Sequence, residues 1–258
     1  VCRRLFGMAI LRDDNFTADV SENFKKQMDE SHDLIEQGCA LYDSLSYEDL
    51  YLTSFDGLRL HARFYKKGDG RRVVLLSHGF RSSARRDFAA VFPLYYAALG
   101  CSLLVPDHRA HGESEGAYIT YGIHERFDIR DWARLLTERA GGDVQIVLDG
   151  ISMGATAVLM ACGTDLPETV TGVVADCGFT SPWDIFSHIL HGTFHLGNFP
   201  ILYSIERMAR RRAHFGFRET TTALAMQHWT KPVLFVHGTA DDFVPPAMTE
   251  AAYAACPA

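Results

Sequence analysis

The motif Gly150-Ile-Ser-Met-Gly154 limits the possible folds more than any other stretch of this chain. It separates a strand-like apolar run that begins at Val144 from a helix-forming run that ends near Met160. Glycines on both sides of a serine at such a junction allow a strained turn, which lifts the serine hydroxyl to the top of a sheet. Ser152 is therefore the candidate nucleophile. The alternative is an ordinary Gly/Ser turn, because motifs of this length recur by chance.

Strand and helix patterns alternate on both sides of this motif and predict an α/β fold. Residues 50–55 and 58–65 alternate apolar and polar side chains around Asp56-Gly57, which predicts an antiparallel hairpin. Beyond it, short apolar runs alternate with helix-forming segments, which predicts a mostly parallel, doubly wound sheet. These runs are 73–76, 101–105, 144–148, 170–175 and 231–237. We expect the ligand crevice at the carboxyl ends of the strands.

Two segments fall outside this alternation. Residues 1–47 are polar and helix-prone, and we predict that they form an N-terminal helical arm ahead of a main domain, 48–258. Residues 183–230 contain many aromatic and aliphatic side chains and separate two strands. We interpret them as a helical cap inserted over the crevice, although a peripheral helical excursion is the alternative.

Composition excludes some classes of protein. A chain of 258 residues can bury the core of one domain with an insertion. Its formal charge of −7 argues against a nucleic-acid partner, and it has no apolar run long enough to span a membrane. The chain starts at Val1 without a methionine and stops just after Cys256-Pro257, so we interpret it as a trimmed segment. Its location is therefore unknown from the sequence: cytoplasmic, or membrane-anchored or exported if a targeting segment precedes Val1.

Four motifs occur in an order that closely resembles the α/β-hydrolase superfamily, over roughly residues 49–258. They are Ser77-His-Gly-Phe80, Asp107-His-Arg-Ala-His-Gly-Glu-Ser114, the Gly150–Gly154 motif and His237-Gly-Thr-Ala-Asp-Asp-Phe-Val-Pro245. The chain is most similar to serine hydrolases of unassigned substrate related to carboxylesterases and monoacylglycerol lipases. The resemblance implies the α/β-hydrolase fold, with a mostly parallel doubly wound sheet, an N-terminal antiparallel hairpin and a helical cap insertion.

The chemistry of acyl transfer suggests roles for the residues in these motifs. A serine hydroxyl needs a base to take its proton and donors to hold the oxyanion that forms. The backbone N–H of Met153 follows the nucleophile directly, and in this fold a second donor comes from the loop after an early strand, here the N–H of Phe80. We assign Phe80 and Met153 to the oxyanion hole. Phe80 could instead be a core aromatic beside an ordinary turn.

The acid is expected after a later strand. The family pattern His-Gly-x-x-Asp-x-x-Val-Pro selects Asp241, with Asp242 as second choice, although either could simply be a turn aspartate that caps the next helix. The chain order Ser, Asp, His requires a histidine after Asp241, and residues 242–258 contain none. We expect this base beyond Ala258. An inactive relative, or a base recruited from elsewhere, are the alternatives.

Other polar residues have structural interpretations. We expect His78 and His237 to be structural, and His108 and His111 to hold their loop by hydrogen bonds. His188, His191 and His195 share one helical face, but Gly192 interrupts that stretch, so no metal is predicted. For Asp149, inside an apolar strand, the expected partner is a backbone group or a histidine.

These observations together predict a cofactor-independent serine hydrolase that cleaves carboxylic esters through an acyl-enzyme on Ser152. The expected partner is a small-molecule ester. A serine peptidase or acyltransferase with the same residues is one alternative, because nothing in the sequence separates an ester from an amide. A non-catalytic scaffold with this fold is another. Acyl length, alcohol group and oligomeric state are not readable from the sequence.

Overall fold

The computed structural model describes residues 1–13 and 29–257. Within them, a 7-stranded sheet has the order β1-β2-β4-β3-β5-β6-β7. Its strands are β1 (Glu48–Thr53), β2 (Arg59–Tyr65), β3 (Arg72–Ser77), β4 (Ser102–Pro106), β5 (Gln145–Ile151), β6 (Val170–Asp176) and β7 (Val233–Val236). β1 pairs with β2 and β2 with β4 in antiparallel fashion, whereas the other neighbours are parallel. The predicted hairpin and mostly parallel sheet are confirmed.

Helices cover both faces of the sheet. Along β3, Val73 and Leu75 point into one apolar core, together with α5 (Glu125–Arg139), α6 (Met153–Ala161) and α10 (Pro246–Ala255). Val74 and Leu76 point into another, with α3 (His32–Ser44), α4 (Ala84–Asp87) and the π-helical turn η1 (Leu94–Ala98) beside it. Successive side chains of a strand alternate between its faces, so continuous apolar runs mark strands buried on both sides.

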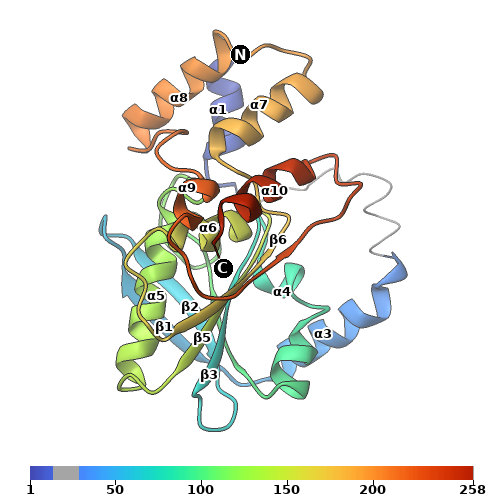
Figure 1. Ribbon diagram of the computed structural model, residues 1–258, viewed down its shortest axis with the longest axis vertical. Coiled ribbons are helices and arrows are strands. Elements are labelled where there is room, and N and C mark those ends of the chain that lie inside the picture. Colours follow the sequence, from blue (N-terminus) through green and yellow to red (C-terminus); the bar gives the residue numbers. More distant parts are fainter. Residues whose placement is uncertain (14–28, 258) are drawn as a thin grey trace.

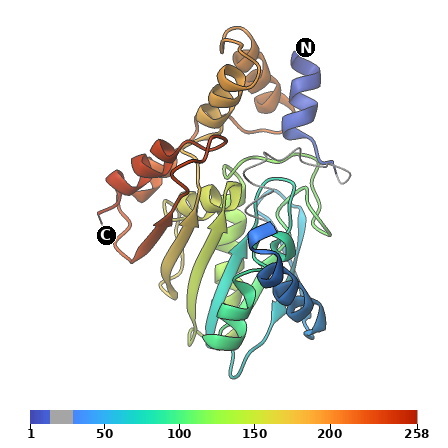
Figure 2. The same cartoon turned by 90° about the vertical axis from the view of Figure 1, so that its right-hand side faces the viewer.

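A third group of helices lies beyond the carboxyl ends of the strands (Figures 1 and 2). It consists of α7 (Pro182–Gly192) and α8 (Ile201–Arg212), which follow β6, and α1 (Cys2–Ile10) from the other end of the chain. Phe6 and Ile10 of α1 share a buried apolar cluster with Leu202 and Ile205 of α8. We call α1, α7 and α8 the helical layer. The short α9 (Thr222–Met226) then leads to β7.

The division into an arm, 1–47, and a main domain, 48–258, stays a prediction. Within the arm, α1 packs on α8 whereas α3 lies beside α4, so these two helices do not form one unit. The part of the arm from 14 to 28 lies outside the described residues. In the portion of the chain that is described, no helix combines the length and apolarity needed to cross a bilayer.

Candidate active site

Ser152 occupies a strained turn between β5 and α6. Its backbone has φ 55° and ψ −116°, far from the conformations that L-residues normally adopt. Such a conformation costs about 1–3 kcal/mol and persists only where the surroundings enforce it. The Ser152 N–H donates to the Asp176 carbonyl oxygen at 2.8 Å, which fixes the turn against the end of β6. The motif therefore folds into the strained strand-to-helix turn that the sequence predicts.

The two glycines of the motif are required by close packing. A Cβ on Gly154 would lie 1.8 Å from the Ser77 carbonyl oxygen, and a Cβ on Gly150 would lie 2.4 Å from the Gly154 carbonyl oxygen. Both distances are far inside van der Waals contact with backbone atoms, which cannot move aside easily. The start of α6 thus sits directly against the end of β3, and this contact brings Ser152 to the loop that follows β3.

That loop carries Phe80, the predicted oxyanion donor. A Cβ on Gly79 would lie 3.6 Å from Ser152 Cβ, so the backbone beside Phe80 borders the serine. The Phe80 ring stacks on Tyr121 with centroids 5.3 Å apart, and Met153 is fully buried at the first position of α6. The N–H groups at the start of a helix have no partner within it, so that of Met153 is suited to the predicted role. Both oxyanion assignments stay predictions.

Asp87, which the sequence analysis missed, fixes the conformation of this loop. Its Oδ2 accepts from the Gly79 N–H at 2.7 Å, and its Oδ1 accepts from the Ser82 hydroxyl at 2.5 Å. Burial raises the pKa of the Asp87 carboxyl above its ordinary value, against the hydrogen bonds from Ser82 and Gly79. The only sequence signal was an acidic residue at the end of a short polar helix. The Asp87 carboxylate, eight residues after Gly79, thus positions the backbone next to Ser152.

The loop after β7 places Asp241 and Asp242 differently. Asp241 is half-buried, and its Oδ1 accepts from the N–H groups of Phe243 and Val244, both at 2.9 Å. Its Oδ2 lies 3.4 Å from His237 Nε2. Asp242 is exposed, and its carbonyl oxygen contacts the His188 ring. One oxygen of Asp241 therefore holds the turn while the other faces a histidine, which makes Asp241 the better placed of the two.

Acidic groups from three loops converge around Cys177, next to Ser152. Burial raises the pKa of the Cys177 thiol to about 12, and Asp176, Asp241 and Asp87 add to that effect by their charge. Burial also raises the pKa of Asp176, which the nearby His237 partly counteracts. The carboxyl ends of β3, β6 and β7 thus bring the candidate acid, the loop-holding Asp87 and the elbow to one place, as expected for the crevice of such a sheet.

Three buried imidazoles brace the two loops on the other side of the elbow. His108 Nε2 lies 2.9 Å from Ser77 Oγ, the His108 N–H donates to His78 Nε2, and the Arg81 N–H donates to His111 Nε2. Burial lowers the pKa of all three rings to about 3, so they are neutral at pH 7. The predicted structural roles of His78, His108 and His111 are confirmed.

An ion-pair network anchors the same region to the hairpin and to α5. Arg109 is buried and donates twice to Asp128 on α5, with both distances 2.7 Å, and again to Asp56 in the β1–β2 turn at 2.8 Å. The planar guanidinium suits such paired carboxylates. The loop 107–116 is thereby tied to two distant elements, which the sequence did not reveal.

The expectation for Asp149 was wrong. Its Oδ2 accepts from the Tyr95 hydroxyl at 2.6 Å, so its partner is a tyrosine on η1 and not a backbone group or a histidine. Burial raises the pKa of Asp149 to about 6. A long side chain from a neighbouring element can reach a buried carboxylate that local groups cannot, since the strand backbone is already paired within the sheet.

In the described part of the chain, no group of three or more His, Cys, Asp or Glu side chains is arranged to hold a metal ion. A shallow cavity of about 470 Å³ lies beside the loop that carries Phe80. It is lined by Arg12, Asp13, Arg81, Ser82, Ala110, His111 and Gly112.

Comparisons with known proteins agree with the fold. A family described as alpha/beta hydrolase fold matches residues 72–198. The uncharacterized protein YqkD of Bacillus subtilis (strain 168) is 25% identical over 229 residues, which cover 89% of this chain and 73% of that protein. The alpha/beta hydrolase domain-containing protein WAV2 of Arabidopsis thaliana is 27% identical over 224 residues, with 82% of this chain and 67% of that protein covered.

Among solved structures, the esterase Pf2001 of Pyrococcus furiosus superposes with a TM-score of 0.65 at 20% identity, and the match covers 96% of this chain and 86% of that chain. At this identity the likeness shows the fold and not the reaction.

Proposed function

Since this chain belongs to the α/β-hydrolase superfamily, we propose that it is a serine hydrolase that cleaves small carboxylic esters through an acyl-enzyme on Ser152. The observation that carries the proposal is the strained backbone of Ser152 at φ 55°. A purely structural serine has no need of such a conformation, because a glycine there would relieve the strain. The choice of ester over amide follows the resemblance of the four sequence motifs to those of carboxylesterases and monoacylglycerol lipases.

In the proposed acylation step, Ser152 Oγ attacks the acyl carbonyl while a base takes the hydroxyl proton. The bond from Oγ to the acyl carbon forms, the ester C–O bond breaks, and the proton passes to the departing alkoxide. The N–H groups of Phe80 and Met153 hold the oxyanion meanwhile. Water then attacks the acyl-enzyme, the bond to Oγ breaks, and the acid leaves as Ser152 regains its proton.

The base in this proposal is a histidine oriented by Asp241. Among the described residues, no hydrogen bond joins Ser152 Oγ to a histidine, and the nearby rings of His78, His108 and His111 already brace loops. The chain order Ser, Asp, His calls for this histidine after Asp241, and residues 242–258 contain none. Neither a cofactor nor a metal ion takes part in the proposed reaction.

The test uses the full-length protein, a panel of nitrophenyl esters and a fluorophosphonate probe. We expect turnover of at least one ester, together with covalent labelling at Ser152 that the Ser152→Ala variant loses. Cleavage of peptide amides without ester turnover would support the peptidase alternative instead. Transfer of the acyl group to an added alcohol in preference to water would support the acyltransferase. Absence of both labelling and turnover in a folded protein would favour the non-catalytic scaffold.

A further inference from the structure

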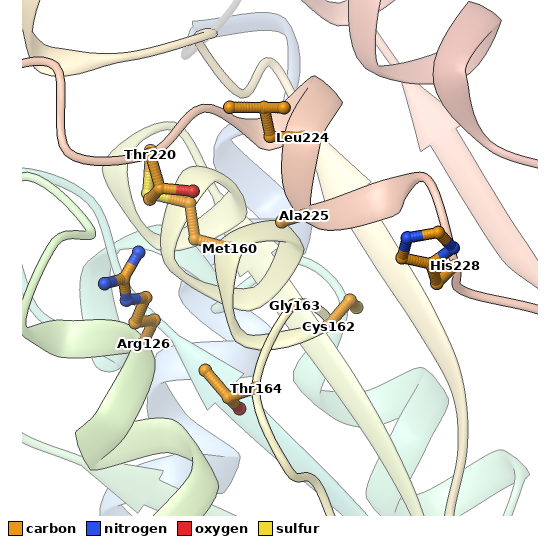
Figure 3. Close-up of a pocket in the computed structure, with 9 residues that line it drawn as sticks. All are labelled: Arg126, Met160, Cys162, Gly163, Thr164, Thr220, Leu224, Ala225 and His228. Carbon is orange, nitrogen blue, oxygen red and sulfur yellow. The ribbon is translucent and has the colours of Figure 1, made fainter.

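A second cavity lies at the opposite end of α6 from Ser152 (Figure 3). It has a volume of about 390 Å³ and opens between the start of α5, the end of α6 and α9. Its lining residues are Arg126, Met160, Cys162, Gly163, Thr164, Thr220, Leu224, Ala225 and His228. Because α6 rises roughly 1.5 Å per residue, its length separates this cavity from the candidate active site.

Arg126 is the unusual member of this lining. Its Nε is buried and has no hydrogen-bond partner among the described residues. Burial lowers the pKa of the Arg126 guanidinium, and the negative charge of Glu219 offsets this lowering only in part. One oxygen of Glu219 already accepts from the Gly216 N–H. The guanidinium also lies over the Phe127 ring at 4.6 Å, so the described part of the chain meets this charge with a ring and a shared carboxylate while its Nε keeps no acceptor there.

Arg130, one turn further along α5, is paired with carboxylates in the usual way. It donates to Asp131 at 2.8 Å and to Asp165 at 3.2 Å. Arg126, by contrast, is the second residue of α5, where the helix dipole disfavours a cation. A buried polar group without a partner in a native structure calls for a bound water or ion to satisfy it.

The cavity also offers groups suited to an organic anion. Arg126 and Thr164 lie at one side, and Leu224 and Ala225 lie above them, with His228 at the far side (Figure 3). The guanidinium presents a planar fork that matches a carboxylate, and the hydroxyl of Thr220 can donate as well, whereas that of Thr164 already donates to the Ala161 carbonyl oxygen. Met160, Leu224 and Ala225 form the apolar part of the lining. The volume falls in the range of small-molecule sites, roughly 300–1,000 Å³, which is larger than a bare ion needs.

We propose that this cavity binds a small aliphatic carboxylate. The carboxylate pairs with Arg126, and its short chain packs against Met160 and Leu224. The site is distinct from the Ser152 crevice, and the proposal does not depend on the proposed hydrolase activity.

Calorimetry on the full-length protein tests this site with sodium butyrate, 1-butanol and inorganic phosphate as probes. We expect butyrate to bind at least about tenfold more tightly than either of the other two, and Arg126→Met to weaken butyrate by at least about tenfold. Arg130→Met is the matched control on the same helix and is expected to leave butyrate binding unchanged.

Equal binding of butanol and butyrate would overturn the role of the charge, and phosphate binding as tight as butyrate would overturn the organic ligand. If Arg126→Met and Arg130→Met bind butyrate with equal affinity, butyrate does not bind at Arg126, and the proposal is wrong. If Arg126→Met does not fold, Leu224→Asp tests the same site, because Leu224 is 56% exposed and a carboxylate there repels the ligand. Unchanged butyrate binding in Leu224→Asp would also contradict the proposal.

Discussion

The loops around Ser152 and the helical layer above them are held together by different forces. Loops 77–87 and 107–116 are fixed by directed bonds, such as Asp87 to Gly79 and Arg109 to Asp128. The helical layer is held by apolar contacts, among them Phe6 and Ile10 against Leu202. Hydrogen bonds are directional, whereas apolar packing tolerates repacking at similar volume. The loops can therefore fix reacting atoms in place, while the helical layer can vary in shape and stay packed.

The largest effect is expected at Ser152. Ser152→Gly should lower ester turnover by at least about 10⁴-fold, because the nucleophile is lost. It should also raise the free energy of unfolding by about 1 kcal/mol, since glycine relieves the strain of φ 55°. Activity assays and urea unfolding measure both. Ser152→Ala is the matched control, with the same loss of turnover and no gain in stability. A Gly variant no more stable than the Ala variant would show that the turn stores no strain.

Arg109→Met should lower the free energy of unfolding by about 3–5 kcal/mol, because it leaves Asp128 buried without its ion-pair partner. The double variant Arg109→Met with Asp128→Leu should recover much of that loss. Thermal and urea unfolding of the whole protein measure the change. If the double variant is no more stable than Arg109→Met alone, the unpaired charge of Asp128 is not the cause of the lost stability.

The helical layer should respond more locally. Ile10→Ala removes a fully buried side chain and should cost about 2–4 kcal/mol, mainly in the attachment of α1 to α8. Amide hydrogen exchange should accelerate in α1 and α8 and stay slow in β5. Met8, which is 56% exposed on the same helix, supplies the control as Met8→Ala. Faster exchange throughout the sheet would mean that the layer and the sheet unfold as one unit.

Asp87→Asn should lower kcat for ester hydrolysis by about 10–100-fold with little change in KM, because the loop beside Ser152 loses its charged acceptor. Ser82→Ala keeps the bond to the Gly79 N–H and should have a smaller effect. Steady-state kinetics separate kcat from KM, and urea unfolding measures stability in parallel. A loss of stability with kcat unchanged would reduce Asp87 to a purely structural residue.

The smallest effect is a pH-dependent one at Asp149. Burial raises its pKa from 3.8 to about 6, so the folded protein binds this proton more tightly than the unfolded chain. The free energy of unfolding should therefore fall as pH rises from about 4 to about 6 and stay reduced above that range. Asp149→Asn should remove this cost and stabilise the protein by about 1–2 kcal/mol at pH 8, but not at pH 4. Urea unfolding at the two pH values measures this difference. An equal gain in stability from Asp149→Asn at pH 4 and pH 8 would show that titration of Asp149 does not cause it.

Features that depend on local sequence patterns could be predicted, whereas contacts between distant parts of the chain could not. The elbow, the strands and the loop histidines produce local patterns, and the structure has them where expected. Asp87 gave no pattern, because its partner Gly79 is recognised only once the loop has folded back. Tyr95 reaches Asp149 across 54 residues, and α1 meets α8 from the other end of the chain. Such contacts depend on tertiary arrangement, which no local period encodes.

The packing of α1 against α8 has a consequence for synthesis on the ribosome. Phe6 and Ile10 leave the exit tunnel well before Leu202 and Ile205, which are made roughly 190 residues later. At about 5–20 residues per second, these apolar side chains wait some ten seconds or more for their partners. During that interval α1 is a nascent amphipathic segment with an uncovered apolar face, so we expect chaperones to engage α1 until α8 has been made.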